Sequence, residues 1–311
     1  MPAPPTPAQI RHVNVRYHDA AAQEYDGKWG IDFGPTGQDQ VLGKLRKALG
    51  SDGELPVFER GLEIGAGTGY FTLNLMLAGV LREAVCTDIS PGMLAALSAN
   101  ATELGLDVDT VAGDAERLDL PDASFDLVFG HAVLHHLPDL ERAFAGFHRV
   151  LRPGGMLAFA GEPSRYGDRL AAVPKRGAVT LAPIWRRLMG AGPAMPGHHH
   201  ALGNGHRDGG DHGMEFFVDV HAFSPTDLRR FALGAGFADP RVTGEELLAS
   251  WFGWANRTLE GTADPDEVPW LWRQYAYRGY LLLQQLDRRL LEGRLPPEAF
   301  YNLMLAARKP D

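Results

Sequence analysis

At four places along the chain, a run of apolar residues is followed by glycine, aspartate or histidine. Glycine lets the backbone turn sharply and lets a ligand approach it closely. Aspartate accepts hydrogen bonds from hydroxyl or amino groups, and histidine exchanges a proton near neutral pH. Together these chemistries suit a small polar ligand. In chain order the residues are Gly65, Gly67 and Gly69, then Asp88, then Asp114, then His131.

The glycine segment follows Leu62-Glu63-Ile64 and has the spacing Gly-x-Gly-x-Gly. Dinucleotide-binding loops need Gly-x-Gly-x-x-Gly, and Tyr70 occupies the position of their third glycine. A bulky side chain there opposes the close packing of helix on strand that such loops require. The P-loop pattern is missing as well, because no Gly-Lys-Ser/Thr follows. Taken alone, the three glycines also suit a plain tight turn.

Two aspartates stand at the ends of the next apolar runs. Asp88 lies about 20 residues beyond the glycine segment, where an acid commonly accepts hydrogen bonds from ribose hydroxyls. Asp114 follows the third run. Either aspartate could instead cap a helix or shape a turn. Their repeated placement favours a ligand site, because ligands of open α/β sheets bind at the carboxyl ends of the strands.

Alternating strands and helices are expected to position these segments. Strands are predicted at 58–64, 83–88, 108–112, 125–129 and 156–160, with helices reaching about 77, at 91–104 and at 140–151. This alternation indicates a parallel, doubly wound sheet. Residues 162–222 are predicted to be irregular. The remaining predicted elements are helices at 8–25, 38–49, 224–233, 245–259 and 269–291, and strands at 240–243 and 300–307.

The order and spacing of these segments resemble those of the class I S-adenosylmethionine-dependent methyltransferases. The resemblance is greatest to the small-molecule branch, which methylates quinone rings and natural products, and it covers 17–157 together with the closing helix and strands. It implies a Rossmann-like α/β fold with a seven-stranded, mostly parallel sheet and an antiparallel last strand. It also implies a helical lid at 1–50 and a methyltransferase domain at 51–311, with cap insertions at 162–222 and 245–298.

By this resemblance the expected cofactor is S-adenosylmethionine, with S-adenosylhomocysteine as its product. Asp88 would accept from the ribose hydroxyls, and Asp114 from the adenine amino group. Ile89 and Met93 would pack on adenine, and Glu63 with the glycine loop would hold the methionine part. The full set that the motifs imply is Glu63, Gly65, Ala66, Gly67, Asp88, Ile89, Met93, Asp114, Ala115 and His131.

The N-terminal segment from Tyr17 to Asp26 resembles the aromatic lid that many small-molecule members lay over the cofactor. Tyr17 and Tyr25 are its expected cofactor contacts. Packing of the two rings in the core is the alternative.

Methyl transfer requires the acceptor atom, the methyl group and the sulfur to lie in line, so positioning is the main task of the protein. A base is needed only where the acceptor holds a proton at neutral pH, and histidine suits that role. His131 and His136 are the expected catalytic residues. The alternative for at least one of His135 and His136 is a structural role, and His221 and Glu162 are weaker candidates for a base.

Charge and hydropathy limit the partners. The formal net charge is −9 and no long run of Lys or Arg occurs, which disfavours nucleic acid as a partner. No stretch approaches the ~20 apolar residues that span a bilayer, so we expect no membrane span and a cytoplasmic location. The expected methyl acceptor is a small hydrophobic or aromatic molecule, methylated on oxygen or carbon.

Two further segments have unusual composition. Residues 190–213 are rich in Gly and His, and we expect a solvated loop with no bound metal, because consecutive histidines point in different directions. Residues 251–280 are rich in Trp and Tyr. These aromatic side chains suit an acceptor pocket, the core of a helical cap or a homodimer interface, and the sequence leaves all three open.

Three other functions compete with this one. A non-catalytic or regulatory S-adenosylmethionine-binding protein of the same fold would have the same motifs, so only turnover separates it from an enzyme. A nicotinamide-dependent oxidoreductase is disfavoured by Tyr70. Methylation of protein or nucleic acid is disfavoured by the charge and because the fourth strand is not followed by an Asn/Asp-Pro-Pro-Tyr/Phe motif.

Overall fold

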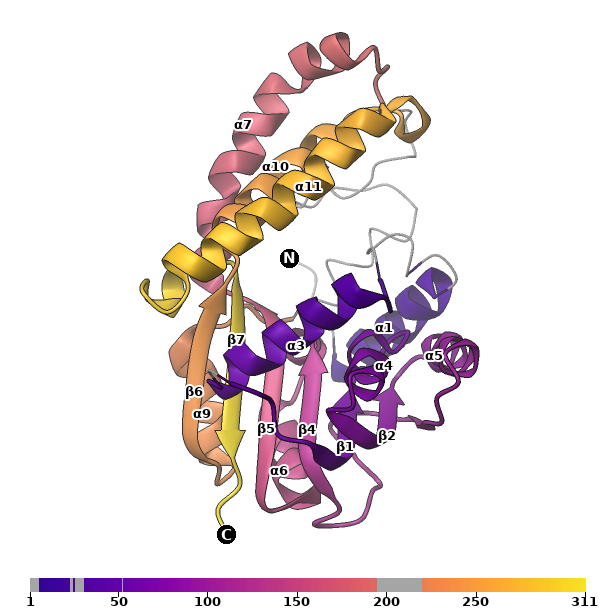
Figure 1. Cartoon of the computed structure of the whole chain (residues 1–311), viewed down its shortest axis with the longest axis vertical. Coiled ribbons are helices and arrows are strands. Elements are labelled where there is room, and N and C mark those ends of the chain that lie inside the picture. The colour runs from indigo at the N-terminus through magenta and orange to yellow at the C-terminus, as the bar shows by residue number, and fades with distance from the viewer. Residues whose placement is uncertain (1–5, 23–24, 26–30, 52, 195–219) are drawn as a thin grey trace. The chain divides into compact units, whose positions relative to one another are not determined.

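The structure is a computed structural model that describes residues 6–22, 25, 31–51, 53–194 and 220–311 (Figure 1). The chain forms two compact units. The first comprises Met1–Glu162, Phe217–Thr243 and Met304–Asp311, and the second Pro163–Phe216 and Gly244–Leu303. The second unit nearly coincides with the insertions predicted at 162–222 and 245–298. Most of the Gly- and His-rich segment, from 195 onward, lies outside the described residues.

Seven strands form one sheet in the order β3-β2-β1-β4-β5-β7-β6. Neighbouring strands from β3 to β5 pair in parallel, and the last strand runs antiparallel (Figure 1). The predicted sheet is thereby confirmed. The strand order changes direction between β1 and β4, which is where open α/β sheets bind ligands. The bounds are β1 (Phe58–Ile64), β2 (Leu81–Asp88), β3 (Asp109–Ala112), β4 (Phe125–His131), β5 (Leu151–Pro163), β6 (Ala238–Glu245) and β7 (Asn302–Arg308).

Four helices of the first unit, α1, α5, α6 and α9, begin at residues whose side chains accept from the first helical turn, whereas α3 and α4 begin after glycines. Ser90 accepts from Met93 N at 3.1 Å at the start of α5, and Asp139 accepts from Arg142 N at 3.0 Å at the start of α6. The helices are α1 (Pro7–Ala21), α3 (Pro35–Leu49), α4 (Tyr70–Leu77), α5 (Pro91–Glu103), α6 (Leu140–Val150) and α9 (Pro225–Gly234), with the 3-10 helix η1 (Leu134–His136).

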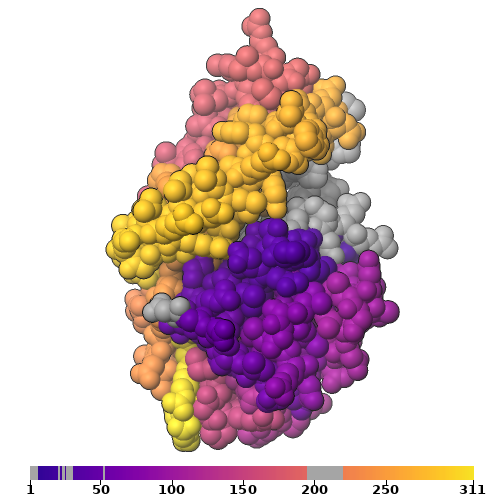
Figure 2. All heavy atoms as spheres, viewed as in Figure 1, coloured from indigo at the N-terminus to yellow at the C-terminus, as the bar shows by residue number. Residues whose placement is uncertain are grey.

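The core of this unit lies on both faces of the sheet, because successive side chains of a strand point to opposite faces. On β5, Ala160 packs with Ala48 of α3, whereas the ring of Phe159 lies 5.3 Å from that of Phe147 of α6. Figure 1 shows α3 and α4 in front of the sheet, and in the same view Figure 2 shows the indigo and purple atoms of the N-terminal part of the chain at the surface. Cys86 of β2 is fully buried in this core, and burial raises the pKa of its thiol.

The second unit is helical and corrects one expectation. Residues 165–189 form a long helix, α7, although the sequence pattern predicts irregular structure there. Pro174 and Pro183 lie within it, but a buried stripe that includes Ala171, Ala178 and Trp185 holds the helix in place. The other elements are α10 (Leu248–Glu260), α11 (Trp270–Leu286), the 3-10 helices η2 (Pro265–Glu267) and η4 (Pro297–Ala299) and the π-helix η3 (Asp287–Leu291). No helix among the described residues is long and apolar enough to cross a membrane.

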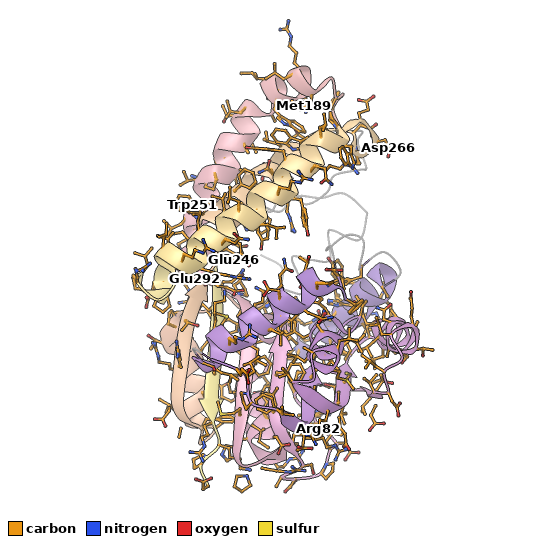
Figure 3. All side chains as sticks on the ribbon, viewed as in Figure 1. Arg82, Met189, Glu246, Trp251, Asp266 and Glu292 are labelled. Atoms are coloured by element: carbon orange, nitrogen blue, oxygen red, sulfur yellow. The ribbon has the colours of Figure 1, made fainter. Side chains whose placement is uncertain are left out.

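Part of the aromatic segment 251–280 packs inside the second unit. The rings of Trp185 and Trp272 lie 5.2 Å apart, and Trp272 also contacts Tyr275 at 5.2 Å. Trp270, in contrast, is 68% exposed. Some of the aromatic side chains therefore form a helical core. Figure 3 labels Met189 and Asp266 near one end of this unit and Glu246 and Glu292 near the other.

Candidate active site

A cavity lies at the carboxyl ends of β1, β2, β3 and β4, with the N-terminal helix α1 along its wall. It holds about 770 Å³ of space free of protein atoms, open solvent included. The lining residues are Arg11, Asn14, His18, Tyr25, Gly65, Gly67, Thr87, Asp88, Ile89, Gly113, Asp114, Ala115, His131, Ala132, Val133, His136 and Leu137.

Most of the residues predicted from the sequence meet at this cavity, although some do not. Those that line it are Tyr25, Gly65, Gly67, Asp88, Ile89, Asp114, Ala115, His131 and His136. Tyr17, Glu63, Ala66 and Met93 are buried without lining it. Tyr17 packs edge-on against His18 at 5.1 Å, so of the two predicted lid tyrosines only Tyr25 faces the cavity.

The glycine loop has a conformation that side chains oppose. Gly65 and Gly67 have φ values of 64° and 52°, in the left-handed region. A Cβ on Gly65 would also lie 2.4 Å from Cγ2 of Val133, whereas one on Gly67 would meet nothing within 4 Å. The loop is pinned by its amides, since Ala66 N donates to Thr87 O at 2.9 Å. Bare backbone is thus presented to the cavity beside Gly67.

Glu63 lies behind this loop and binds the next helix. Its carboxyl group accepts hydrogen bonds from Thr72 N at 3.1 Å and from the Thr72 hydroxyl, which fastens α4 to β1. Burial raises the pKa of Glu63 from 4.5 to about 8. The structure does not bring this side chain to the cavity, where the sequence motif places it beside the methionine part.

Asp88 stands at the end of β2 and faces the cavity. Its Oδ2 accepts from Gly67 N and its Oδ1 from Ser90 N, both at 2.9 Å. Burial raises the pKa of Asp88, while these backbone donors and the nearby His18 oppose that rise. An ionised carboxylate can accept about four hydrogen bonds, so Asp88 retains acceptor capacity toward a ligand. This arrangement fits the two hydroxyls of a ribose.

Asp114 ties the loop after β3 to the N-terminal helix. Its Oδ1 accepts from Glu116 N at 2.9 Å, and its Oδ2 pairs with Arg11 Nε of α1 at 2.9 Å. Arg11 also pairs with the buried Glu116. At the other end of α1, Asp19 accepts from Gly92 N at 3.0 Å. Sequence reasoning missed these anchors, which hold α1 against the loops after β2 and β3.

His131 ends β4 and lines the cavity, and its ring stacks on that of Phe71 with 4.8 Å between centroids. His136 also lines the cavity, and its ring lies 5.7 Å from that of His18 and 3.9 Å from that of His135. His135 is buried, and its Nδ1 lies 2.9 Å from Glu162. Of this pair, His135 is therefore the one that binds the buried Glu162, and His136 is the one that lines the cavity.

Glu162, at the end of β5, fixes the segment between these histidines. It is fully buried and accepts from Val133 N and Leu134 N at 3.0 Å and from His135 N at 3.2 Å. His221, the other weaker candidate for a base, lies 3.0 Å from Leu137 O through its Nε2 and does not line the cavity. Within the described ranges, no group of three or more His, Cys, Asp or Glu side chains is arranged to hold a metal ion.

Residues 62–159 match the protein family described as a methyltransferase domain, and they contain the glycine loop, Asp88, Asp114 and His131. Over this segment, about a third of its length, the chain is similar to methyltransferases, and its sheet has the order of the class I methyltransferase fold. Methyltransferase domains of this kind use S-adenosylmethionine, and the acceptor capacity of Asp88 and the bare backbone at Gly67 are compatible with its ribose and methionine parts.

Curated relatives share this domain. The chain is 38% identical over 183 residues to the malonyl-[acyl-carrier protein] O-methyltransferase of Methylococcus capsulatus, covering 58% of each chain. It is 33% identical over 165 residues to the 27-O-demethylrifamycin SV methyltransferase of Amycolatopsis mediterranei, covering 50% of this chain and 58% of the relative. The chain thus spans less than two thirds of the length of these relatives.

Solved structures share the fold at low identity. One is phosphoethanolamine N-methyltransferase 2 of Haemonchus contortus with S-adenosylmethionine, at TM-score 0.58 and 18% identity, covering 97% of this chain and 60% of that one. Another is the [4+2]-cyclase SpnF, at TM-score 0.55 and 17% identity, covering 99% of this chain and 98% of that one. A methyltransferase and a cyclase share this fold, so the fold by itself does not assign the reaction.

Proposed function

We propose that the chain transfers the methyl group of S-adenosylmethionine to an oxygen or carbon atom of a small, hydrophobic or aromatic molecule. The observation that carries this proposal is the position of Gly67, Asp88 and His131 on the wall of one cavity. Glycine backbone, a carboxylate and a histidine there suit the amino-acid part, the sugar and the reacting end of a single nucleoside. When bound, the cofactor supplies an electrophilic methyl group on a sulfonium sulfur.

The protein would contribute mainly by positioning. Asp88 binds the ribose hydroxyls and is itself fixed by Gly67 N and Ser90 N. The loop at Gly65 and Gly67 receives the methionine part, and Ile89 packs on the adenine ring. Holding two reactants in a reactive geometry can lower a barrier by roughly 7–11 kcal/mol. In-line displacement therefore needs little more from the protein than a fixed cofactor and a fixed acceptor.

His131 and His136 would act as bases only where the methyl-accepting atom of the substrate still carries a proton. Stacking on Phe71 fixes the plane of the His131 ring at the cavity, where it can accept the proton of an acceptor hydroxyl. A carboxylate acceptor is already ionised and needs no base. His131→Ala should then slow methylation of a phenol by about 10²–10⁴-fold and leave methylation of a carboxylate nearly unchanged.

The names of the curated relatives favour oxygen as the acceptor atom. Malonyl-[acyl-carrier protein] O-methyltransferase and 27-O-demethylrifamycin SV methyltransferase are both named for an oxygen acceptor, whereas demethylmenaquinone methyltransferase of Thermus thermophilus, 36% identical over 99 residues, is not. We therefore propose an oxygen acceptor as the first class to test. The proposal also includes a cytoplasmic location and no nucleic-acid partner. It is compatible with a homodimer.

The test is incubation of the purified protein with methyl-labelled S-adenosylmethionine and a cell extract, followed by mass spectrometry of labelled products. We expect a labelled small molecule and an equal amount of S-adenosylhomocysteine. The matched control is Asp88→Ala, which should give neither. Tight binding of S-adenosylhomocysteine without any labelled product would instead identify a non-catalytic binder of the cofactor, and a melting temperature raised by NAD alone would identify a nicotinamide enzyme.

A further inference from the structure

One face of the N-terminal helix α1 lines the cavity. Arg11, Asn14 and His18 recur at the spacing i, i+3, i+7, which places them on the same side of a helix, and all three line the cavity. Arg11 and Asp19 hold this helix to the loops after β3 and β2. The face is thus built into the wall of the site.

Asn14 has an unusual position on this face. The residue is only 4% exposed, and its Oδ1 has no hydrogen-bond partner within the part of the chain that the structure describes. Buried side-chain acceptors in folded proteins are nearly always paired, because an unpaired one loses its water without compensation. A buried carboxamide oxygen on the wall of a ligand site therefore points to a donor on the ligand.

Asp114, the residue that the sequence motif assigns to the adenine amino group, is already engaged on both oxygens. One accepts from Glu116 N at 2.9 Å, and the other pairs with the guanidinium of Arg11 at 2.9 Å. The Arg11 charge is one helical turn before Asn14. Asp114 thus serves the attachment of α1, and of these side-chain oxygens only Asn14 Oδ1 has no partner in the part of the chain that the structure describes.

The position along the sheet edge indicates which part of the ligand carries that donor. Neighbouring strands lie about 4.8 Å apart, and the site runs from the glycine loop after β1, through Asp88 after β2, to Asp114 after β3. The methionine part and the ribose occupy the first two positions, so the base lies at the third. There Arg11 binds Asp114 and places the next turn of α1 beside the base.

We propose that the Asn14 carboxamide accepts a hydrogen bond from the 6-amino group of adenine, and that Asp114 anchors Arg11 instead. This inference rests on the proposed S-adenosylmethionine function. A carboxamide offers an acceptor next to a donor, which matches the amino group and a ring nitrogen on the edge of adenine. Asn14 would then make the site select adenine over purines that lack the amino group.

The experiment is calorimetric titration of the full chain with S-adenosylhomocysteine and with its analogue that has hydrogen in place of the 6-amino group. The wild-type protein should bind the amino form about tenfold more tightly, which corresponds to about 1.4 kcal/mol. In Asn14→Leu the two affinities should agree within about twofold. Asn14→Asp, which keeps an acceptor of the same shape, should retain the preference.

Two further variants separate the role of Asn14 from that of Asp114. Asn14→Ala repeats the measurement with a smaller side chain in case Asn14→Leu does not fold. In Asp114→Asn the preference should persist, because Asp114 does not read the base. Loss of the preference for the amino form in Asp114→Asn, together with its persistence in Asn14→Leu, would overturn the assignment to Asn14 but not the proposed function. A wild-type protein that binds both ligands equally would have the same consequence. A wild-type protein with no affinity for either ligand would overturn the proposed function as well.

Discussion

Each of the two units contains a fully buried carboxylate that accepts backbone N–H groups at the start of a helix. In the first unit, Glu162 accepts from three consecutive amides, those of Val133, Leu134 and His135. In the second unit, Asp287 accepts from Leu248 N at 3.0 Å and Ala249 N at 2.9 Å at the start of α10. Burial raises the pKa of Asp287.

The difference lies in what each carboxylate fixes. The segment at Glu162 is part of the cavity wall, and its Ala132 has a φ of 53°, which a non-glycine residue adopts only when its surroundings impose it. The segment at Asp287 begins a helix whose residues line no part of this cavity. The same local device serves a ligand site in one unit and helix packing in the other, so its place in the fold decides its role.

Replacing Glu162 by alanine should have the largest effect. Three backbone donors and the His135 ring would lose their buried acceptor, and each unpaired group costs about 1–3 kcal/mol, so we expect a loss of roughly 4 kcal/mol in the free energy of unfolding. Urea denaturation measures it, with the exposed Glu141→Ala as the control. A variant within about 1 kcal/mol of the wild type would show that these hydrogen bonds do not hold the cavity wall.

Asp88→Ala tests the ligand side of the comparison. We expect the affinity for S-adenosylhomocysteine to fall at least 100-fold, or by about 2.7 kcal/mol, because the ribose hydroxyls lose their acceptor and Gly67 N loses its own. Calorimetry measures the affinity, and Asp107→Ala, an exposed position beyond α5, is the matched control. Unchanged affinity in Asp88→Ala would contradict the assignment of the cavity to this cofactor.

Asp287→Ala tests the second unit, where the buried carboxylate is expected to serve helix packing only. Loss of a helix-capping carboxylate costs about 0.5–2 kcal/mol, and because Asp287 is fully buried we expect a value near the upper end, about 2 kcal/mol. The affinity for S-adenosylhomocysteine should stay within about twofold of the wild type. Asp266→Ala, exposed in the same unit and labelled in Figure 3, should change neither. A large loss of affinity in Asp287→Ala would mean that the second unit supports the cofactor site.

The sequence predicts the strand-end part of the site well. Asp88, Asp114 and His131 follow apolar runs, and parallel strands bring such positions to one edge, where the structure places all three on one cavity. The sequence predicts less well which residues of these motifs face the core instead of the cavity. Glu63 and Met93 belong to the same motifs but face the core, because side chains that are adjacent in sequence point in different directions from a strand or a helix.

Tertiary contacts account for what the sequence does not predict. Asn14 and Arg11 join the site through an ion pair between α1 and the loop after β3, more than 100 residues away. Glu162 acts on amides 27 to 29 residues earlier in the chain. The helix α7 contains prolines that argue against it locally, and its buried face overrides them. In each case a partner distant in sequence determines the outcome.

Glu63 is a further buried carboxyl group of the first unit, and its expected effect is a dependence of stability on pH. Its pKa is about 8 in the folded protein against a usual value of 4.5. Between these values the unfolded chain binds fewer protons than the folded one, so stability should fall as the pH rises, by at most about 1.4 kcal/mol per pH unit. Below 4.5 and above about 8 this contribution should be constant.

Urea denaturation at pH 5.5, 6.5 and 7.5 measures this slope. Glu63→Gln keeps an acceptor for Thr72 N but cannot ionise, so its stability should lose the falling component. Glu59→Gln, exposed on the same strand, should keep the wild-type slope. If Glu63→Gln and the wild type run parallel, Glu63 is ionised in the folded protein.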